Sequence, residues 1–204
     1  MTIKKGQDWG STGRLDPSAP SADSDAALAA LFSVDDSGTL RGPAQVGLLG
    51  GDLATTLGAR ASESELREST RTLLPLDLAV VEWGAGAKVM SASLVIRSTT
   101  WTGPIRAVMN AAYFGEWNVA PSGHPNDGRL DVIEATLGLG DRFKARKRLP
   151  AGLHVPHPDI SIRRLKTVDW QVKARERVWI DHVEISGVET LTVQVHPDAT
   201  VVAI

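Results

Sequence analysis

The sequence contains no cysteine among its 204 residues. That absence excludes disulfides, thiolate nucleophiles, zinc sites built on sulfur and iron–sulfur clusters. A surplus of positive charge is missing as well, since 22 Lys and Arg stand against 24 Asp and Glu. Nucleic-acid binding depends on neutralising phosphates, so a protein without a basic surplus is not expected to bind nucleic acid.

Long hydrophobic runs are also lacking. No window approaches the roughly 20 apolar residues that a membrane-spanning helix needs. The basic N-terminus leads into no apolar stretch of the kind found in signal peptides. Apolar residues make up 42% of the chain and charged residues 23%, which is ordinary for a protein that buries a core. We therefore expect a cytoplasmic globular protein.

The first part of the chain is small and polar in character. Residues 16–25 are rich in proline, serine and aspartate, which predicts a loop. Asp25 then stands as an acidic cap in front of an apolar stretch whose spacing predicts a short helix over residues 26–32. We expect residues 1–45 to form a peripheral arm or linker with this helix, and residues 46–204 to form one domain.

From Leu74 onward the apolar residues alternate with polar ones, as in 76–80 and 191–195. Period two over short segments separated by Gly, Pro, Asn and Asp predicts an antiparallel β-sandwich. One predicted helix precedes this pattern and one segment interrupts it. Ser62 and Glu65 form a capping-box sequence that predicts a helix through about Thr72, and residues 141–149 have helical composition. The expected fold is therefore mainly β, with a few peripheral helices.

The most informative segments lie in the second half of the chain. An aromatic-Gly segment runs into Ala120-Pro121 and is followed by Asn126-Asp127-Gly128-Arg129-Leu130-Asp131. Then come a His-Pro pair, an Asp-His-Val-Glu turn and two closing strands. In order, these segments are residues 111–121, 124–132, 157–160, 181–184, 191–195 and 200–204. They resemble the C-terminal half of the diacylglycerol kinase-like lipid kinases, a group that includes sphingosine kinases.

A second match lies at residues 49–58, Leu-Gly-Gly-Asp-Leu-Ala-Thr-Thr-Leu-Gly. It resembles the segment that leads into the second domain of those kinases, and it places Asp52 on the family's aspartate. Gly50-Gly51-Asp52 could instead begin the family's Gly-Gly-Asp-Gly-Thr nucleotide loop. Leu53 argues against that alternative, because a leucine blocks the approach of backbone N–H groups to phosphate.

The resemblance thus covers residues 46–204 and implies the diacylglycerol/NAD kinase C-terminal type of β-sandwich. The family's N-terminal domain, which binds ATP, needs far more than the 49 residues that precede Gly50. We therefore expect this chain alone not to bind ATP.

The resemblance also implies a structural Mg²⁺ ion, held by the aspartate of an Asp-Gly-x-Leu segment. Asp127 occupies that position here, and carboxylate and carbonyl oxygens suit this ion. Asn-Asp-Gly is equally typical of an ordinary tight turn that holds no metal. Both interpretations stay open.

An Asp-Gly-Glu turn supplies the general base in the family, where the glutamate deprotonates the lipid hydroxyl. Asp181 matches its aspartate, but Val183 stands at the glutamate position and cannot move a proton. Glu184 comes one residue late, which turns its side chain to the other face of a strand unless a bulge intervenes. His182 could serve as the base instead. An ordinary solvent-facing turn is the alternative.

The candidate site residues on this basis are Asp181, His182 and Glu184 for catalysis, and Asp52 and Trp117 for substrate binding. The densest basic segment is Arg142–Arg148, which could contact an anionic membrane surface peripherally. A solvated helix face is the alternative for that segment.

Three functions are compatible with these features. The chain could be a non-catalytic member that binds a lipid, a phosphate compound or a protein partner. It could be one half of a split lipid kinase whose nucleotide-binding domain is a separate chain. A complete kinase is disfavoured, because phosphoryl transfer depends on positioning phosphates that no loop here would hold. We favour the first function and keep the second as the alternative.

Overall fold

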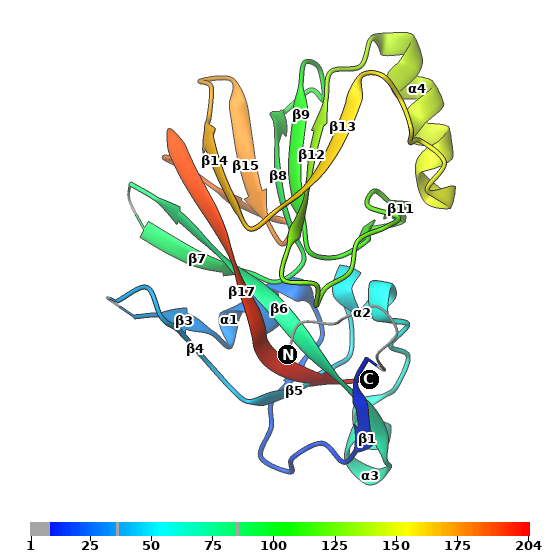
Figure 1. The fold of residues 1–204 in the computed structure, drawn as a ribbon, viewed down its shortest axis with the longest axis vertical. Helices are drawn as coiled ribbons and strands as arrows, with labels where there is room; N and C mark the ends of the chain where they lie inside the picture. The colour runs from blue at the N-terminus through cyan, green and yellow to red at the C-terminus, as the bar shows by residue number, and fades with distance from the viewer. Residues whose placement is uncertain (1–8, 36, 85) are drawn as a thin grey trace.

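The computed structural model (Figure 1) describes residues 9–35, 37–84 and 86–204. Two β-sheets face each other in the upper half of the view, and the two longest strands run down from one of them into a lower unit that carries three short helices.

The first sheet has seven strands in the order β1-β6-β17-β5-β2, with β7 paired to β6 and β14 paired to β17. Their bounds are β1 Ser11–Gly13, β2 Ser21–Ala22, β5 Gln45–Leu48, β6 Arg71–Trp83, β7 Gly86–Met90, β14 Thr167–Gln171 and β17 Thr190–Ala203. β6 and β17 pair antiparallel, with a register shift between His196 and Thr200. The pairs β17–β5 and β5–β2 are parallel, and both lie in the lower unit.

The second sheet has six antiparallel strands in the order β13-β12-β9-β8-β15-β16. Their bounds are β8 Ser93–Ser98, β9 Ile105–Met109, β12 Leu130–Ala135, β13 Ile160–Leu165, β15 Glu176–Ile180 and β16 Val183–Ile185. Two small hairpins complete the strands, β3 (Ser33–Val34) with β4 (Leu40–Arg41) and β10 (Tyr113–Phe114) with β11 (Trp117–Asn118).

The sandwich core lies between the two sheets. Alternate residues of a strand point to opposite faces, so Val81, Ile96 and Val193 are buried in the interior while their neighbours face outward. The predicted β-sandwich is confirmed, and it is the period-two pattern of these strands that produces it.

A second core fills the lower unit and includes residues that we expected in a peripheral arm. Leu28 of α1 (Asp25–Ala30) and Ala22 are at most 1% exposed. β1 pairs with β6 and β2 pairs with β5. The structure therefore differs from the expected linker, because residues 9–34 contribute strands and apolar side chains to the main sheet and its core. Outside the predicted helix, their apolar residues are too few and too scattered to indicate strands.

The remaining helices are close to the predicted ones. α2 spans Asp52–Leu57, and α3 spans Glu63–Glu68 with the capping box of Ser62 and Glu65 in place. α3 ends before Thr72, because Ser69 is extended and β6 begins at Arg71. α4 spans Leu139–Arg148 and continues into a 3₁₀ turn, η1, at Leu149–Ala151.

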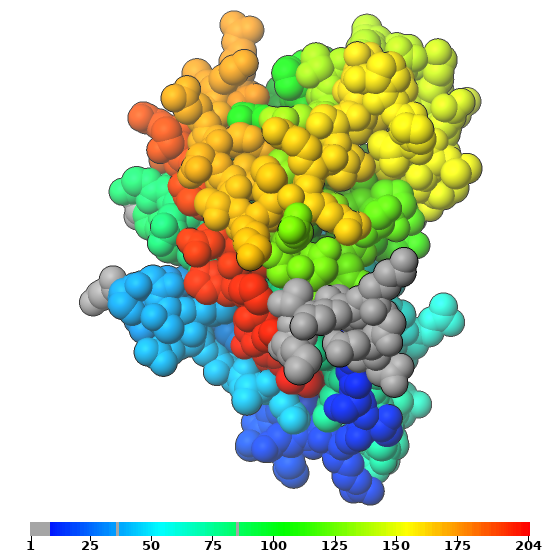
Figure 2. All heavy atoms as spheres, viewed as in Figure 1, coloured from blue at the N-terminus to red at the C-terminus, as the bar shows by residue number. Residues whose placement is uncertain are grey.

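α4 covers the outer face of the second sheet, the face turned away from the sandwich core. In Figure 1 it lies at the upper right beside β13, and in Figure 2 its residues join the yellow group at the upper right. A third apolar cluster on this face includes Ala107, Met109 and Ile133. In the part of the chain that the structure describes, no helix combines the length and the apolar character needed to cross a bilayer.

Candidate functional site

The N-terminus of α2 meets the carboxylate of Asp25. Asp25 accepts hydrogen bonds from the backbone N–H groups of Asp52 and Leu53, at 2.6 and 3.0 Å. A side chain at Gly51 would lie 2.6 Å from the Asp25 carboxylate, so only glycine permits this approach. Burial raises the pKa of Asp25 to about 6. The Gly50-Gly51-Asp52 segment thus holds a carboxylate of the chain itself where a phosphate loop would hold phosphate.

Asp52 and His182 form a hydrogen-bonded pair although 130 positions separate them in sequence. His182 Nε2 lies 2.7 Å from Asp52 Oδ2, and Gly115 N–H donates to Asp52 Oδ1 at 2.8 Å. The bond to Asp52 raises the pKa of the His182 imidazole above its ordinary value. A histidine oriented by a buried carboxylate can hold or transfer a proton.

His182 occupies a backbone conformation that favours glycine. It follows Asp181 in the tight turn between β15 and β16. The φ angle is 65° at His182 and 47° at Asp181. The imidazole stacks on Phe114, with 4.3 Å between ring centroids. Because a non-glycine residue in this region is disfavoured, the bond to Asp52 and the stack on Phe114 stabilise the strained turn.

Ligand atoms of Asp25, Asp52 and His182 all lie within 4.8 Å of one another, a spacing that would admit a metal ion. Both oxygens of Asp25 already accept backbone N–H groups, and both oxygens of Asp52 are bonded as well. Backbone N–H groups and the His182 imidazole therefore already engage all four carboxylate oxygens.

Asp181 does not face this pair. Its carboxylate is 2% exposed and accepts hydrogen bonds from the backbone N–H groups of Ser91, Ala92 and Ser93, at 2.8 to 2.9 Å. Burial raises the pKa of Asp181, and these hydrogen bonds oppose that effect. Its observed contacts fix the turn that carries His182 against the loop between β7 and β8.

Glu184 lies on β16, opposite Trp179 of β15. Its carboxylate pairs with Arg177 at 3.7 Å, and 47% of its side chain is exposed. The structure therefore brings two of the predicted site residues together, Asp52 and His182, places Asp181 directly behind them, and leaves Glu184 at the rim.

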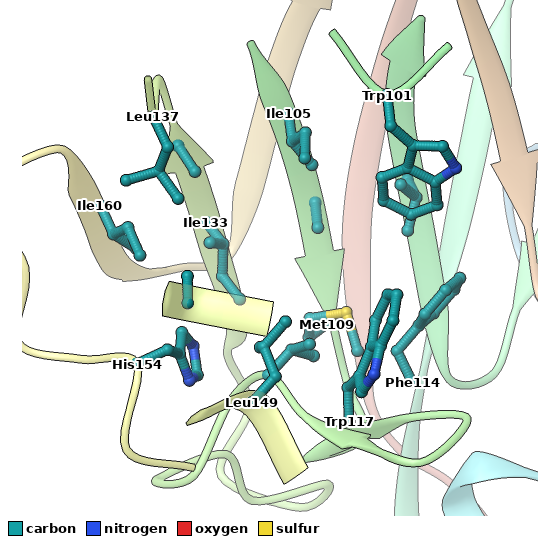
Figure 3. A pocket seen from close by; sticks show the side chains of 15 residues that line it. Trp101, Ile105, Met109, Phe114, Trp117, Ile133, Leu137, Leu149, His154 and Ile160 are labelled. Atoms are coloured by element: carbon teal, nitrogen blue, oxygen red, sulfur yellow. The ribbon is translucent and has the colours of Figure 1, made fainter. Parts of the chain in front are cut away.

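An apolar cavity of about 120 Å³ opens on the outer face of the second sheet. Ala107, Met109 and Ile133 line its floor, and Ala145 and Leu149 line it from α4 and η1 (Figure 3). Such a lining can bind an apolar group and offers almost nothing to a polar one.

The two ends of this cavity differ. Figure 3 shows Leu137 and Ile160 at one end, and Trp101, Phe114 and Trp117 at the other. Trp117, a predicted substrate-binding residue, thus lines the cavity. His154 is the polar residue of the lining; it is 6% exposed, and its Nδ1 has no hydrogen-bond partner among the described residues. Burial lowers the pKa of His154, which favours its neutral form.

Asp127 lies in the turn before β12, away from the cavity lining. Its Oδ1 accepts the N–H of Arg129 at 3.0 Å, and its Oδ2 lies 3.6 Å from the guanidinium of Arg164. Gly128, with φ 70°, donates its N–H to the fully buried Asp77 at 2.7 Å. An arginine already supplies positive charge to this carboxylate, so the residues fit a tight turn better than a cation site. Magnesium at Asp127 stays a prediction of the resemblance.

The basic segment is only partly available for a partner. Arg142 donates to the backbone carbonyls of Leu137, Trp101 and Gly103, and so ties α4 to the turn after β8. Arg146 lies over the ring of Trp117 at 5.7 Å. Lys147 and Arg148 are exposed.

The chain matches a family model described as the YegS C-terminal NAD kinase beta sandwich-like domain, over residues 77–204. The chain belongs to that family. The match begins at the buried Asp77 of β6 and ends with β17, so it contains the whole six-stranded sheet and the turn that carries His182. Of the seven-stranded sheet it contains β7, β14, β17 and the part of β6 from Asp77 on, while β1, β2 and β5 precede it.

Solved structures of this fold include a diacylglycerol kinase from Bacillus anthracis, which matches with a TM-score of 0.55 and 15% identity. The match covers 78% of this chain and 66% of that one. A candidate diacylglycerol kinase from the same organism matches with a TM-score of 0.57 and 14% identity, over 78% and 68% of the two chains. At these identities the likeness establishes the fold of the YegS C-terminal domain. A search of curated proteins found no match.

Sequence reasoning missed three residues that build the site. Asp25 was expected only to cap α1, whereas Ser24 is the N-cap and the carboxylate of Asp25 bonds to α2. Arg97, beside the cavity, and His154, within it, were not candidate site residues. Their positions on alternating or extended segments gave no signal that could distinguish them from other surface and core residues.

Proposed function

We propose that this member of the YegS C-terminal domain family binds the acyl chain of a lipid in the apolar cavity beneath α4, and does not transfer phosphate by itself. The cavity supports this proposal, since its lining is apolar except for His154. A cavity of this chemistry suits a chain of methylenes better than a polar metabolite.

The size of the cavity sets the expected strength of binding. At about 120 Å³ it is somewhat smaller than an apolar cavity of about 150 Å³ that is known to hold benzene. It can therefore enclose about four methylenes, each contributing ~0.8 kcal/mol on leaving water. The total of about 3 kcal/mol corresponds to a factor of more than 100 in affinity.

The chemistry of the polar residues supports a non-catalytic role for the isolated chain. The backbone N–H groups at the start of α2 bind Asp25, and Val183 stands where the family has its general base. Lost phosphate positioning and lost proton transfer each cost on the order of 10² to 10⁴ in rate.

A split kinase is the second candidate, and the Asp52–His182 pair favours it. His182 is held by a carboxylate, and its side chain is 46% exposed at the edge of the site. In a complex with a separate nucleotide-binding chain it could act as the general base that Val183 cannot provide. Labelled phosphate transfer to diacylglycerol that appears only on adding such a chain would favour this candidate.

Lipid binding can be tested through the tryptophans that line the cavity. Titration with ω-bromododecanoic acid is expected to quench the tryptophan fluorescence of the full chain saturably, with one equivalent bound, because bromine on the chain would lie near Trp101 and Trp117. Trp117→Phe should remove a large part of the quenching. Trp83→Phe, at the end of β6 outside the cavity lining, is the matched control and should not change it. Absence of saturable quenching, or quenching that Trp117→Phe leaves intact, would contradict the proposal.

The proposal extends to peripheral contact with an anionic membrane through α4. Leu139 and Phe143 are 80% and 67% exposed, and they lie one helical turn apart beside Lys147 and Arg148. Apolar side chains flanked by basic ones are typical of helices that lie on a bilayer surface.

Sedimentation with vesicles checks this contact. The chain is expected to bind vesicles that contain phosphatidylserine and not those of phosphatidylcholine alone, since each basic residue near an anionic surface contributes about 1 kcal/mol. Phe143→Ser with Leu139→Ser should weaken that binding about tenfold or more. Leu153→Ser, also exposed but outside α4, is the comparison variant. Equal binding to both kinds of vesicle would contradict the contact.

A further inference from the structure

Arg97 of β8 is clamped between two indoles. Its guanidinium carbon lies 3.8 Å from the ring centre of Trp101 and 4.0 Å from that of Trp179. Stacking on both faces leaves only the edge of the guanidinium group for hydrogen bonds, and that edge is the part that binds carboxylate or phosphate.

Trp101 reaches this position at a conformational cost. Its φ is 57°, in the left-handed region that large side chains rarely adopt. Its carbonyl accepts a hydrogen bond from Arg142 of α4 at 2.7 Å, and its ring meets Trp117 edge-on at 6.0 Å. Several contacts therefore hold a strained residue over Arg97, an arrangement found more often at binding sites than elsewhere.

The charge of Arg97 is incompletely compensated. Among the described residues it forms no ion pair; its Nη1 donates to the carbonyls of Ser98 and Thr99, at 2.9 and 3.5 Å. Burial lowers the pKa of Arg97, which reflects partial loss of water from the cation. A partly buried guanidinium whose remaining donors are unpaired has a binding site for an anion.

His182 lies in the same cleft, which has a volume of about 250 Å³. Its Nε2 is bonded to Asp52, and its Nδ1 has no hydrogen bond to any residue that the structure describes. Val95, Trp101 and Phe114 line both this cleft and the apolar cavity, so the two spaces adjoin. Figure 3 shows Trp101 and Phe114 at that shared end.

We propose that this cleft binds the anionic headgroup, a phosphate monoester or carboxylate, of a single-chain lipid whose tail enters the adjoining cavity. Arg97 supplies the paired donors and His182 a further one. The inference rests on the proposed acyl-chain binding and adds the chemistry of the headgroup.

The acidic groups nearby are engaged elsewhere. Glu184, which faces Arg97, pairs with Arg177 at 3.7 Å. Asp52 is bonded to His182 and to the N–H of Gly115. Asp25 and Asp181 are buried behind the turn and bind backbone N–H groups. Arg97 is therefore left with unpaired donors that face the cleft.

Binding of matched ligands below their micelle concentrations tests the headgroup. The full chain is titrated with dodecyl phosphate, monolauroylglycerol and inorganic phosphate. We expect dodecyl phosphate to bind at least about tenfold more tightly than the neutral lipid. Raising NaCl from about 0.05 to about 0.5 M should reduce that preference and leave monolauroylglycerol binding unchanged.

Variants of Arg97 test whether this residue causes the preference for dodecyl phosphate over monolauroylglycerol. Arg97→Gln should abolish it while leaving monolauroylglycerol binding within about twofold, and Arg97→Lys should retain part of it. Arg129→Gln, which removes an exposed arginine outside the cleft, should behave as the wild type. The salt dependence of the wild type gives the answer even where an Arg97 variant fails to fold.

Each failure has a separate meaning. Equal affinity of the wild type for dodecyl phosphate and monolauroylglycerol overturns the headgroup site and leaves acyl-chain binding standing. No binding of either lipid overturns both proposals. Inorganic phosphate that binds as tightly as dodecyl phosphate overturns the lipid headgroup and indicates a site for free phosphate.

Discussion

Replacing Asp181 with alanine is expected to lower the free energy of unfolding by about 3 kcal/mol or more. The wild-type carboxylate accepts three backbone N–H groups, from Ser91, Ala92 and Ser93, in a position that is 2% exposed. Alanine leaves these donors buried without an acceptor, and each such donor costs about 1 to 3 kcal/mol. A loss of this size is a large part of the total stability of an ordinary domain, about 5 to 15 kcal/mol.

Chemical denaturation followed by circular dichroism measures this loss. Asp181→Asn retains one acceptor oxygen in the same shape, so its loss should be smaller than that of the alanine variant. Asp169→Ala serves as the matched control, because that aspartate is exposed and bonds only to the Thr192 hydroxyl among the described residues. Its effect should stay within about 0.5 kcal/mol. If Asp181→Ala lowers the free energy of unfolding no more than the Asp169→Ala control does, this carboxylate does not hold the turn.

The same carboxylate illustrates what the sequence can and cannot predict. Asp181 was identified from a family motif that assigns its turn to catalysis, and it lies in the tight turn between β15 and β16. The direction of its side chain depends on Ser91–Ser93, about 90 positions earlier, because the turns after β7 and β15 pack together. No local pattern carries that information.

The sandwich itself was predictable, because the alternation of apolar and polar residues within each core strand indicates which of its side chains are buried. The pattern in β15, where Val178 and Ile180 are buried and their neighbours face outward, is a local property of five residues. Residues 9–34 lack such a pattern. β2 and β3 are two residues long, so alternation cannot be recognised, and Leu28 is buried because long strands from later in the chain reach it.

The candidate site could be predicted from the sequence only in part. Asp52 and His182 were both singled out by motif, yet their pairing joins the start of α2 to a turn 130 positions away. Arg97 and Trp179 carried no motif at all. Their significance arises from a sheet register that places Val95 opposite Trp179 and Arg97 opposite Arg177, so that all four side chains lie on one face.

The second large effect is expected from filling the cavity. Ala107→Phe places a benzyl group on the floor formed by β9, in a space of about 120 Å³. Since an apolar cavity of about 150 Å³ accommodates benzene, one phenyl ring occupies nearly all of this space. The acyl chain then loses the burial of about four methylenes, and its affinity should fall about 100-fold or more.

The stability of the variant separates this effect from misfolding. Filling an apolar cavity generally leaves the free energy of unfolding unchanged or raises it, so Ala107→Phe should unfold at the wild-type temperature or above it. Ala145→Phe fills the same space from α4 and should give the same loss of binding. Ala174→Phe adds the same ring at an exposed position between β14 and β15, and should bind lipid as the wild type does. Because the two filling variants approach from opposite walls, undiminished binding in both would mean that the acyl chain lies elsewhere on the protein.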